Sequence, residues 1–491
     1  MSEASWIVVG VAAAYLAACL ALGTLSSRGQ AASTVGYVAG DRSLGLVLMY
    51  FITGATIFSA FAFLGLPGWA YTRGAAAFYI LGYGALGFVP FYFLGPRAAR
   101  VGKKRGFVTQ AEMVAARFES PAIAGVMALV SAVAFVPYLA LQMKGAGLVL
   151  RTVTDGAVPE AAGAAIVYAV VLAYVLASGV LGVGWTNTFQ GLFMIALAWG
   201  LGLYLPSLRF GGVEPMFREL LASRPELLAS PGLAADGSAW HWGEYGSAVI
   251  VSVVGFSAWP HLFMKAFTAK DARTIRRTVL LYPTFQIFLL PLFLIGFAGV
   301  GIAPAPQSPD EILPHLLMQL EVSPWLVGLF CAGALAASMS SGDAMLHAVA
   351  SISVRDGWIA ALGRALAPAR ELFAIRALVV LYVIAAYAVA VIYEGSLVLL
   401  LLGAYGAIVQ FMPGLVAALY WRRATAAGVL AGMLAGGGLS LVFVLAPEWR
   451  PFPCHAGLYG VTLNALVLVI VSRVTPPSAS SDAFLRDAAG R

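Results

Sequence analysis

The chain has 491 residues, of which 61% are hydrophobic and 10% charged, and its formal net charge is +7. Soluble domains are nearer half apolar and a quarter charged, so a soluble chain of this composition would expose large apolar patches. The composition excludes a secreted disulfide scaffold, a nucleic-acid-binding protein and a typical soluble enzyme. It indicates an all-α polytopic membrane protein.

Apolar runs of about twenty residues, the length that crosses a bilayer as a helix, recur along the chain. Divided at charge clusters and at Gly, Pro, Asn and Asp turns, they predict thirteen spans: 6–24, 44–67, 75–96, 121–149, 158–180, 185–208, 245–267, 278–302, 323–353, 372–393, 395–420, 424–446 and 455–473. We expect a single transmembrane domain over residues 1–474 and a disordered cytoplasmic tail over 475–491.

Basic residues predict the orientation, because the cytoplasmic loops of membrane proteins carry more Lys and Arg than the outer loops. With the N-terminus outside, 22 of the 29 basic residues lie in cytoplasmic segments, six lie outside and Lys144 falls within a span. Lys265 is counted among the cytoplasmic cations. The opposite orientation would reverse this bias, so the chain is predicted to be N-out and C-in.

The second predicted span is interrupted by small and polar residues at mid-bilayer depth. It contains Thr53, Gly54, Thr56 and Ser59 and ends in GLPG at 65–68. Irregular backbone survives in a bilayer only where protein or water satisfies it, and in secondary transporters such unwound points coordinate cations. A Gly/Thr-rich face for close helix packing explains the same residues equally well.

The ninth predicted span carries a second group of small polar residues. Ala337, Ser340 and Ser341 stand at positions i, i+3 and i+4 and therefore share one helix face. Two hydroxyls and a loosened carbonyl would form half a shell of neutral oxygens, which suits a hard monovalent cation. Small-residue packing, with each serine bonded to the carbonyl four residues earlier, is the alternative.

Three titratable residues inside predicted spans raise functional hypotheses. Asp343 points to a different face from the serines, and pairing with a neighbouring helix or cytoplasmic water explains it. Lys144 lies where a long side chain reaches the membrane surface. His261 follows Trp259 and Pro260, which breaks the helix, so this imidazole is a candidate for binding the carboxylate of a solute.

Protease, hydrolase and ATP-driven pump motifs are missing from the sequence. It contains no HExxH, GxSxG, P-loop or intramembrane pair of carboxylates. Cys19, Cys331 and Cys454 are scattered without metal-ligand spacing. The chain is therefore not expected to be an enzyme or to hold a cofactor.

Four passages resemble the sodium:solute symporter family, the bacterial relatives of the sodium–glucose cotransporters. In the family's order, they are GATIFSAFAFLGLPGWAYTRG at 54–74, GVGWTNTFQGLFM at 182–194, GALAASMSSGDAMLHAVASISVRD at 333–356, and the stretch from Gln410 to Gly432. The resemblance implies a leucine-transporter-type core of two inverted five-helix repeats over 44–208 and 245–420. An extra helix, 6–24, precedes this core, and two helices over 424–473 follow it.

The resemblance also implies a site for one coupling Na⁺. Its ligands would be the carbonyls of Ala55, Phe58 and Ala337 and the hydroxyls of Ser340 and Ser341. The family's acid in its W-T-D stretch is replaced here by Asn187. Because family members with a second sodium site place that acid near it, a single sodium ion is expected.

The passages VPYLALQMKGAGLVL at 136–150 and WPH at 259–261 look most like the monocarboxylate branch of the family. The implied solute is of the lactate, pyruvate or acetate type. The residues expected to line its cavity are Thr56, Ile57, Ser59, Tyr138, Gln142, Trp259, His261 and Gln410.

The resulting prediction is a sodium-coupled importer of a small organic solute that works by alternating access in the bacterial inner membrane. Its partners would be the solute, Na⁺ and the bilayer, with no nucleic acid and no obligatory protein partner. Pantothenate, proline and other small solutes stay open as substrates. So do a transporter-like sensor and proton coupling through His261.

Overall fold

The computed structural model describes residues 3–25, 34–393 and 404–490, and across these residues it is helical, with two isolated β-bridges and no strand. This described part contains ten helices long and apolar enough to cross a membrane, or eleven if a pair bent by 47° is one span. Two shorter apolar helices, Leu46–Ile57 and Ala404–Tyr420, add to these. The chain is an integral membrane protein; the thirteen spans and the N-out orientation stay predictions.

The described part of the first half of the chain supplies ten α-helices, several of them short or interrupted. They are α1 (Glu3–Leu25), α2 (Thr34–Ala39), α3 (Leu46–Ile57), α4 (Leu66–Arg73), α5 (Phe78–Leu86), α6 (Val89–Arg105), α7 (Gln110–Phe118), α8 (Pro121–Val153), α9 (Glu160–Phe210) and α10 (Val213–Ser223). Between α3 and α4 lies a π-helical turn, Phe61–Gly65. The predicted span 44–67 is therefore broken, as its small polar residues indicated.

The second half repeats this pattern of long and broken helices. It contains α11 (Trp242–Phe256), α12 (Pro260–Phe263), α13 (Lys265–Thr268), α14 (Ala272–Gln286), α15 (Leu289–Gly299), α16 (Ile312–Gln319), α17 (Pro324–Ile352), α18 (Pro368–Ile392), α20 (Phe411–Tyr420), α21 (Ala426–Leu445), α22 (Ala456–Val474) and α23 (Ser481–Ala489). The predicted span 395–420 begins outside the described residues.

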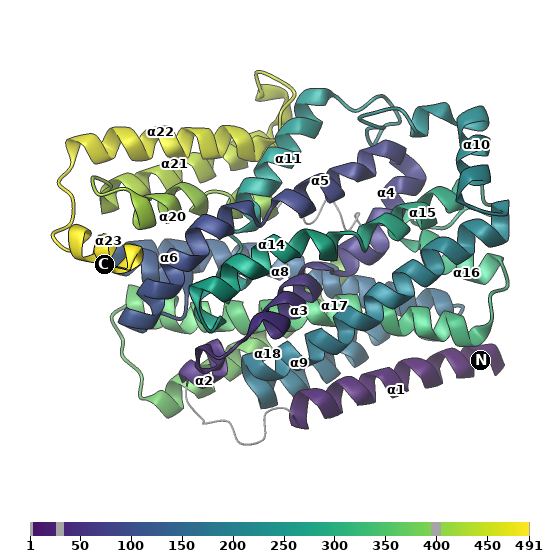
Figure 1. Ribbon diagram of the computed structural model, residues 1–491, viewed down its shortest axis with the longest axis horizontal. Coiled ribbons are helices and arrows are strands. Elements are labelled where there is room, and N and C mark those ends of the chain that lie inside the picture. Colours follow the sequence, from purple (N-terminus) through teal and green to yellow (C-terminus); the bar gives the residue numbers. More distant parts are fainter. Residues whose placement is uncertain (1–2, 26–33, 394–403, 491) are drawn as a thin grey trace.

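Helix α17 is the centre of the molecule (Figure 1). Of an apolar 18-residue stretch within Pro324–Ala361, 83% is buried, against 22% of such a stretch in α18. Every residue from Phe330 to Ile352 is buried, and the helix packs on α1, α3, α8, α9 and α18. The small side chains Gly333, Ala336 and Ala337 permit this close approach of neighbouring backbones.

A glycine marks the break within α9, which separates the predicted spans 158–180 and 185–208. Gly179 has φ +60° and ψ −161°, a conformation that residues with a side chain rarely adopt. A Cβ added at Gly179 would also lie 2.8 Å from the Tyr37 carbonyl oxygen. The position requires glycine for both reasons.

The C-terminal segment is not the disordered tail that its composition predicted. Helix α23 packs on α6, with the Phe484 side chain fully buried. Asp487 accepts from Lys104 Nζ at 2.5 Å, and Arg105 Nη2 lies 2.6 Å from its other carboxylate oxygen. The tail is ordered because two basic residues at the C-terminal end of α6 pair with Asp487 and because the apolar face of this amphipathic helix packs inward.

We predict that Gly202→Ala destabilises the contact between α9 and α15. An added Cβ would lie 2.2 Å from Pro291 Cβ and 2.6 Å from the Pro291 carbonyl oxygen, so one helix must move. Overpacking of this kind costs about 1–3 kcal/mol. Thermal unfolding of the purified protein measures the effect. Gly200→Ala is the matched control, because nothing lies within 4 Å of its added Cβ, and an equal loss in both variants would contradict the prediction.

Candidate ion and solute site

The two polar groups found in the apolar spans meet between α3 and α17. Ser340 Oγ donates to the Ala55 carbonyl oxygen at 2.9 Å, and Ser341 Oγ donates to the Thr56 carbonyl oxygen at 2.7 Å. The Ala337 carbonyl oxygen lies 3.3 Å from Ser340 Oγ. All five residues are fully buried. The contact is thus built from neutral oxygens alone.

The α3 carbonyls are available because the helix ends at Ile57. In a continuous helix the Ala55 and Thr56 carbonyls would accept from the amides of Ser59 and Ala60. Here the Ser59 amide donates to the Ile57 carbonyl at 2.9 Å. The Ala60 amide donates to Gln142 Oε1 on α8, also at 2.9 Å. The hydrogen bond from the Ala60 amide to Gln142 therefore stabilises the break in α3.

Phe58 lies at the break itself, with ψ of 83°. The Ala62 amide, which a regular helix would direct at the Phe58 carbonyl, donates to the Ser59 carbonyl instead. The Phe58 ring stacks on Phe285 and packs edge-on against Phe288, with centroid distances of 5.0 and 4.3 Å. This packing anchors the broken segment against α14 and the start of α15.

Asn187 on α9 joins both halves of the site. Its Nδ2 donates to Thr56 Oγ1 and to the Ser340 carbonyl oxygen, both at 3.2 Å. Its Oδ1 is buried and has no hydrogen-bond partner among the described residues. Asn187 thus contributes polar atoms to the contact but no charge.

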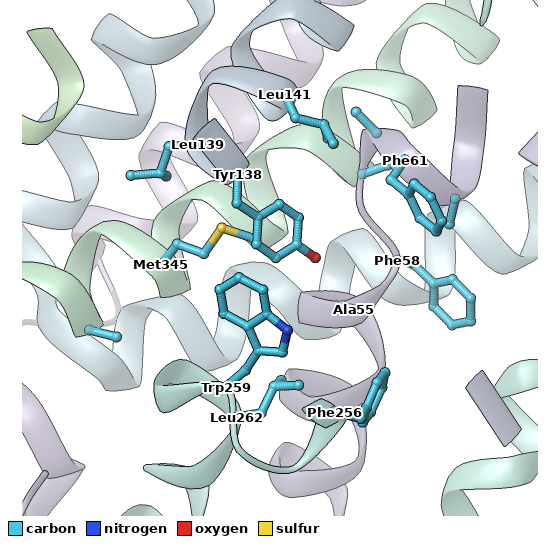
Figure 2. Packing of buried hydrophobic residues seen from close by; sticks show 14 of the residues in the cluster. Ala55, Phe58, Phe61, Tyr138, Leu139, Leu141, Phe256, Trp259, Leu262 and Met345 are labelled. Carbon is cyan, nitrogen blue, oxygen red and sulfur yellow. The ribbon is translucent and has the colours of Figure 1, made fainter. Parts of the chain in front are cut away.

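Tyr138, Trp259 and His261 form an aromatic group beside the break in α3, and Figure 2 shows Tyr138 and Trp259 there. The Tyr138 ring lies 5.0 Å from the Trp259 ring and 6.2 Å from the His261 ring, and Trp259 and His261 lie 5.7 Å apart. Figure 2 shows the Tyr138 hydroxyl turned toward the open backbone between Ala55 and Phe61. The structure therefore brings α8 and the bend between α11 and α12 to the broken end of α3.

Several polar atoms around this aromatic group are buried without a partner in the described part of the chain. They are Ser59 Oγ, Gln142 Nε2, Trp259 Nε1 and His261 Nδ1. A buried polar atom left unpaired costs about 1–3 kcal/mol. Three of the four are hydrogen-bond donors, and the fourth can be one. The arrangement is suited to a small ligand rich in acceptor oxygens.

Some predicted solute residues face elsewhere. Gln410 Nε2 donates to the Gly406 carbonyl oxygen, and Asn464 on α22 donates to Gln410 Oε1 at 3.1 Å, so its hydrogen bonds do not reach the aromatic group. Thr56 Oγ1 donates back to the Ile52 carbonyl oxygen at 2.5 Å, and Ile57 is half-buried at the end of α3.

Two titratable residues lie near the site, and the pairing of Asp343 with a neighbouring helix was one of the two sequence interpretations. Asp343 lies on α17 just beyond Ser341, and its Oδ2 accepts from the Tyr174 hydroxyl at 2.9 Å. Lys265, counted from the sequence as cytoplasmic, is buried in α13 and interacts electrostatically with Asp343. Pro260 and the apolar residues around Lys265 were the signal that it belongs to a bent span.

Charged residues gather at the end of the bundle that is predicted to face outside. Lys144 Nζ donates to the Tyr393 carbonyl oxygen at 2.7 Å and lies 3.7 Å from Glu160 Oε1. Arg151 pairs with both Glu160 and Glu311. These residues line a cavity of about 430 Å³. Burial raises the pKa of the Glu311 carboxyl above its ordinary value near 4.5, against the opposing charge of Arg151.

Known proteins resemble this chain in sequence. The model of the sodium:solute symporter family matches residues 37–436. The uncharacterized symporter YhjB of Bacillus subtilis (strain 168) is 28% identical over 98% of this chain and 99% of its own length. A monocarboxylate transport permease protein of Rhizobium johnstonii is 24% identical over 93% of this chain and 95% of its own.

A solved structure resembles the whole chain. The substrate-bound, outward-open state of a Na⁺-coupled sialic acid symporter superposes with a TM-score of 0.78 at 20% identity, covering 96% of this chain and 98% of its own. This likeness shows a leucine-transporter-type fold.

We predict that Glu311→Gln gains stability relative to the parent protein as the pH rises above about 4.5. The raised pKa means that the folded state favours the neutral carboxyl, so the stability contributed by Glu311 is complete at low pH and is lost as it ionises. Gln stays neutral throughout. Thermal unfolding of both proteins across this pH range measures the difference. Exposed Glu321→Gln controls for the loss of one charge, and a difference that shrinks with rising pH would contradict the prediction.

Proposed function

The chain belongs to the sodium:solute symporter family, and from this premise we propose that it couples the import of a monocarboxylate to one Na⁺. Sodium-coupled transport of a small solute, without enzymatic activity, follows from the family and the fold. The observation that carries the proposed ion site is the meeting of freed α3 carbonyls with two α17 hydroxyls.

The proposed Na⁺ ligands are the carbonyls of Ala55, Phe58 and Ala337 and the hydroxyls of Ser340 and Ser341. Neutral oxygens suit a monovalent ion, because one bound charge cannot offset the burial of several carboxylates. Bound Na⁺ would replace two hydrogen bonds between α3 and α17 with ion–oxygen contacts. The ion then joins the broken helix to the central helix, which is the contact that must change during alternating access.

The proposed solute cavity lies between the break in α3 and the aromatic group. Ser59 Oγ, Gln142 Nε2 and Trp259 Nε1 supply unpaired donors that a carboxylate would accept from, and Tyr138 and His261 complete the wall. These donors carry no charge themselves. The charge of the carboxylate would be balanced by the co-bound Na⁺, so that the loaded site is neutral overall. The similarity to a monocarboxylate permease supports this class.

We place the protein in the bacterial inner membrane with its N-terminus outside. The bias of basic residues and the bacterial source of the relatives support this placement. In this orientation the cavity lined by Lys144, Arg151 and Glu311 is the entrance for solute.

Ser340→Ala combined with Ser341→Ala should raise the Na⁺ concentration that half-activates uptake by at least about tenfold. Each hydrogen bond or ligand to a charged group contributes about 1.5–3 kcal/mol, and about 1.4 kcal/mol is a factor of ten. Uptake of radiolabelled solute into proteoliposomes measures the effect. Ser351→Ala, which removes a hydroxyl bonded to the His347 carbonyl on the same helix, should leave Na⁺ activation unchanged. Unchanged activation in the double variant would reject the ion site.

The substrate class is tested by uptake of pyruvate, lactate and acetate, compared with proline and pantothenate, under an inward Na⁺ gradient. We expect the monocarboxylates to accumulate without stimulation by an inside-negative membrane potential, because one Na⁺ and one monoanion move no net charge. Proline is zwitterionic, so proline moving with one Na⁺ would gain about 2.3 kcal/mol per 100 mV.

Other outcomes of the uptake experiment identify the alternatives. Accumulation of proline or pantothenate alone would reject a small monocarboxylate of the lactate, pyruvate or acetate type as the substrate. Binding without accumulation would indicate a sensor. Uptake driven by a pH gradient without Na⁺, and lost in His261→Gln, would indicate proton coupling.

A further inference from the structure

Three arginines gather where α6 packs on α14 and α20, at the end of the bundle that is predicted to be cytoplasmic. Arg97 and Arg100 lie on α6, and Arg276 lies on α14. Arg97 and Arg276 are close enough for their positive charges to act on Arg100. Helix α6 also packs on α23, and Figure 1 shows α6, α20 and α23 at the same end of the molecule. Like charges held together in this way favour an anion beside them.

The protein supplies little negative charge to this arginine cluster. Among the described residues, no carboxylate oxygen lies within 4 Å of a guanidinium nitrogen of Arg97, Arg100 or Arg276. The carboxylate of Asp487 on α23 is already paired with the two basic residues that end α6. The cluster therefore carries positive charge that the described part of the chain does not neutralise.

Tyrosine rings contact two of the three guanidinium groups. The Arg97 guanidinium carbon lies 3.9 Å from the centroid of the Tyr420 ring, and Arg97 Nη1 donates to the Leu419 carbonyl oxygen at 2.8 Å. The Arg276 guanidinium carbon lies 5.7 Å from the centroid of the Tyr92 ring. Tyrosine is enriched where the hydrocarbon of a membrane meets the lipid headgroups. These contacts indicate that both arginines lie at the depth of the lipid phosphates.

Exposed apolar side chains lie one helical turn from each of these two arginines. On α6, Val89, Phe93 and Arg97 follow one another at spacings of four residues and so share one face. Val89 is 49% exposed and Phe93 is 60% exposed. On α14, Leu280 stands four residues after Arg276 and is 67% exposed. A guanidinium group above a strip of exposed hydrocarbon matches a phospholipid, which has a phosphate above its acyl chains.

We propose that the surface formed by α6 and α14 binds an anionic phospholipid of the cytoplasmic leaflet, whose phosphate accepts hydrogen bonds from Arg97 and Arg276. An acyl chain would lie along Phe93 and Leu280, and Arg100 adds positive charge beside the phosphate. Guanidinium groups suit this ligand because their planar fork of donors matches two phosphate oxygens. One lipid would thereby bridge the two helices. The inference does not depend on the proposed coupling ion or solute.

The bridged helix α14 also contacts the candidate ion and solute site. Phe285 on α14 stacks on the Phe58 ring at the break in α3, and α14 packs along α3. Phe285 lies nine residues after Arg276 on the same helix. A lipid bound at Arg276 would therefore stabilise the helix against which the broken segment packs.

Lipid titration of the purified, delipidated protein in a non-ionic detergent tests the site. Phosphatidylglycerol, phosphatidylcholine with the same acyl chains and inorganic phosphate are added separately. Native mass spectrometry measures lipid binding, and thermal unfolding measures the stabilisation that binding produces. We expect phosphatidylglycerol to bind at least about tenfold more tightly than phosphatidylcholine, because each basic residue near an anionic lipid contributes roughly a factor of five. Inorganic phosphate, which has no acyl chain, should not stabilise the protein at the same concentration.

Substitutions of the arginines assign the lipid preference to this surface. Arg97→Gln combined with Arg276→Gln should remove most of the preference for phosphatidylglycerol. Arg97→Lys combined with Arg276→Lys should retain part of it, because lysine keeps the charge but not the fork of donors. Arg364→Gln combined with Arg370→Gln removes two exposed arginines elsewhere and is the matched control, which should bind lipid as the parent does. If the glutamine variant does not fold, the lysine variant and the comparison of lipids in the parent still decide.

Several results would overturn the proposal. Equal binding of the two lipids would show that the surface does not recognise the anionic headgroup. Equal stabilisation by inorganic phosphate would show a phosphate site that needs no lipid. An unchanged preference in the glutamine variant, or an equal loss in the control variant, would show that Arg97 and Arg276 do not form the site. A failure of Na⁺-driven solute uptake would reject the proposed function alone, since lipid binding does not depend on transport.

Discussion

The structure depends on the requirement that every backbone polar group be satisfied where no water is present. Helix α3 stops in the middle of the bundle, and this frees carbonyls and amides that hydrocarbon cannot accommodate. Ser340 and Ser341 donate hydrogen bonds to two of these carbonyls, and the Gln142 side chain accepts one from the Ala60 amide. The break is therefore stable only because α8 and α17 lie against it. The same carbonyls, released from the helix and held only by hydroxyl groups, are oxygens that an ion can bind.

The sequence predicted the main features of the fold because they are local. Apolar runs show helices, and the residues around Gly54 and Ser340 stand out because polar and very small residues are rare in such runs. The face shared by Ala337, Ser340 and Ser341 follows from helical spacing alone. The resemblance named the Ala55 and Phe58 carbonyls as partners of the serines in the ion site, whereas the structure pairs the serines with the Ala55 and Thr56 carbonyls. No spacing rule relates residues so far apart in the chain.

The sequence could not predict contacts that depend on how the helices pack. Gln142 accepts a hydrogen bond at the break in α3 although it lies more than eighty residues further along the chain. Gln410 accepts a hydrogen bond from Asn464 on α22. Lys265 was counted with the cytoplasmic cations although it lies near the end of the predicted span 245–267, and the bend at Pro260 buries it. The C-terminal helix escaped prediction because its order comes from α6, not from its own composition.

The neutral amide of Asn187 also bears on how far the cell could concentrate its solute. If one Na⁺ and one monoanion move together, the membrane voltage does no work on the pair, and the solute ratio cannot exceed the sodium ratio. A tenfold sodium gradient then stores only about 1.4 kcal/mol for each molecule imported. Such a protein is suited to scavenging a metabolite that the cell consumes at once, because it cannot hold a large internal pool against a dilute medium.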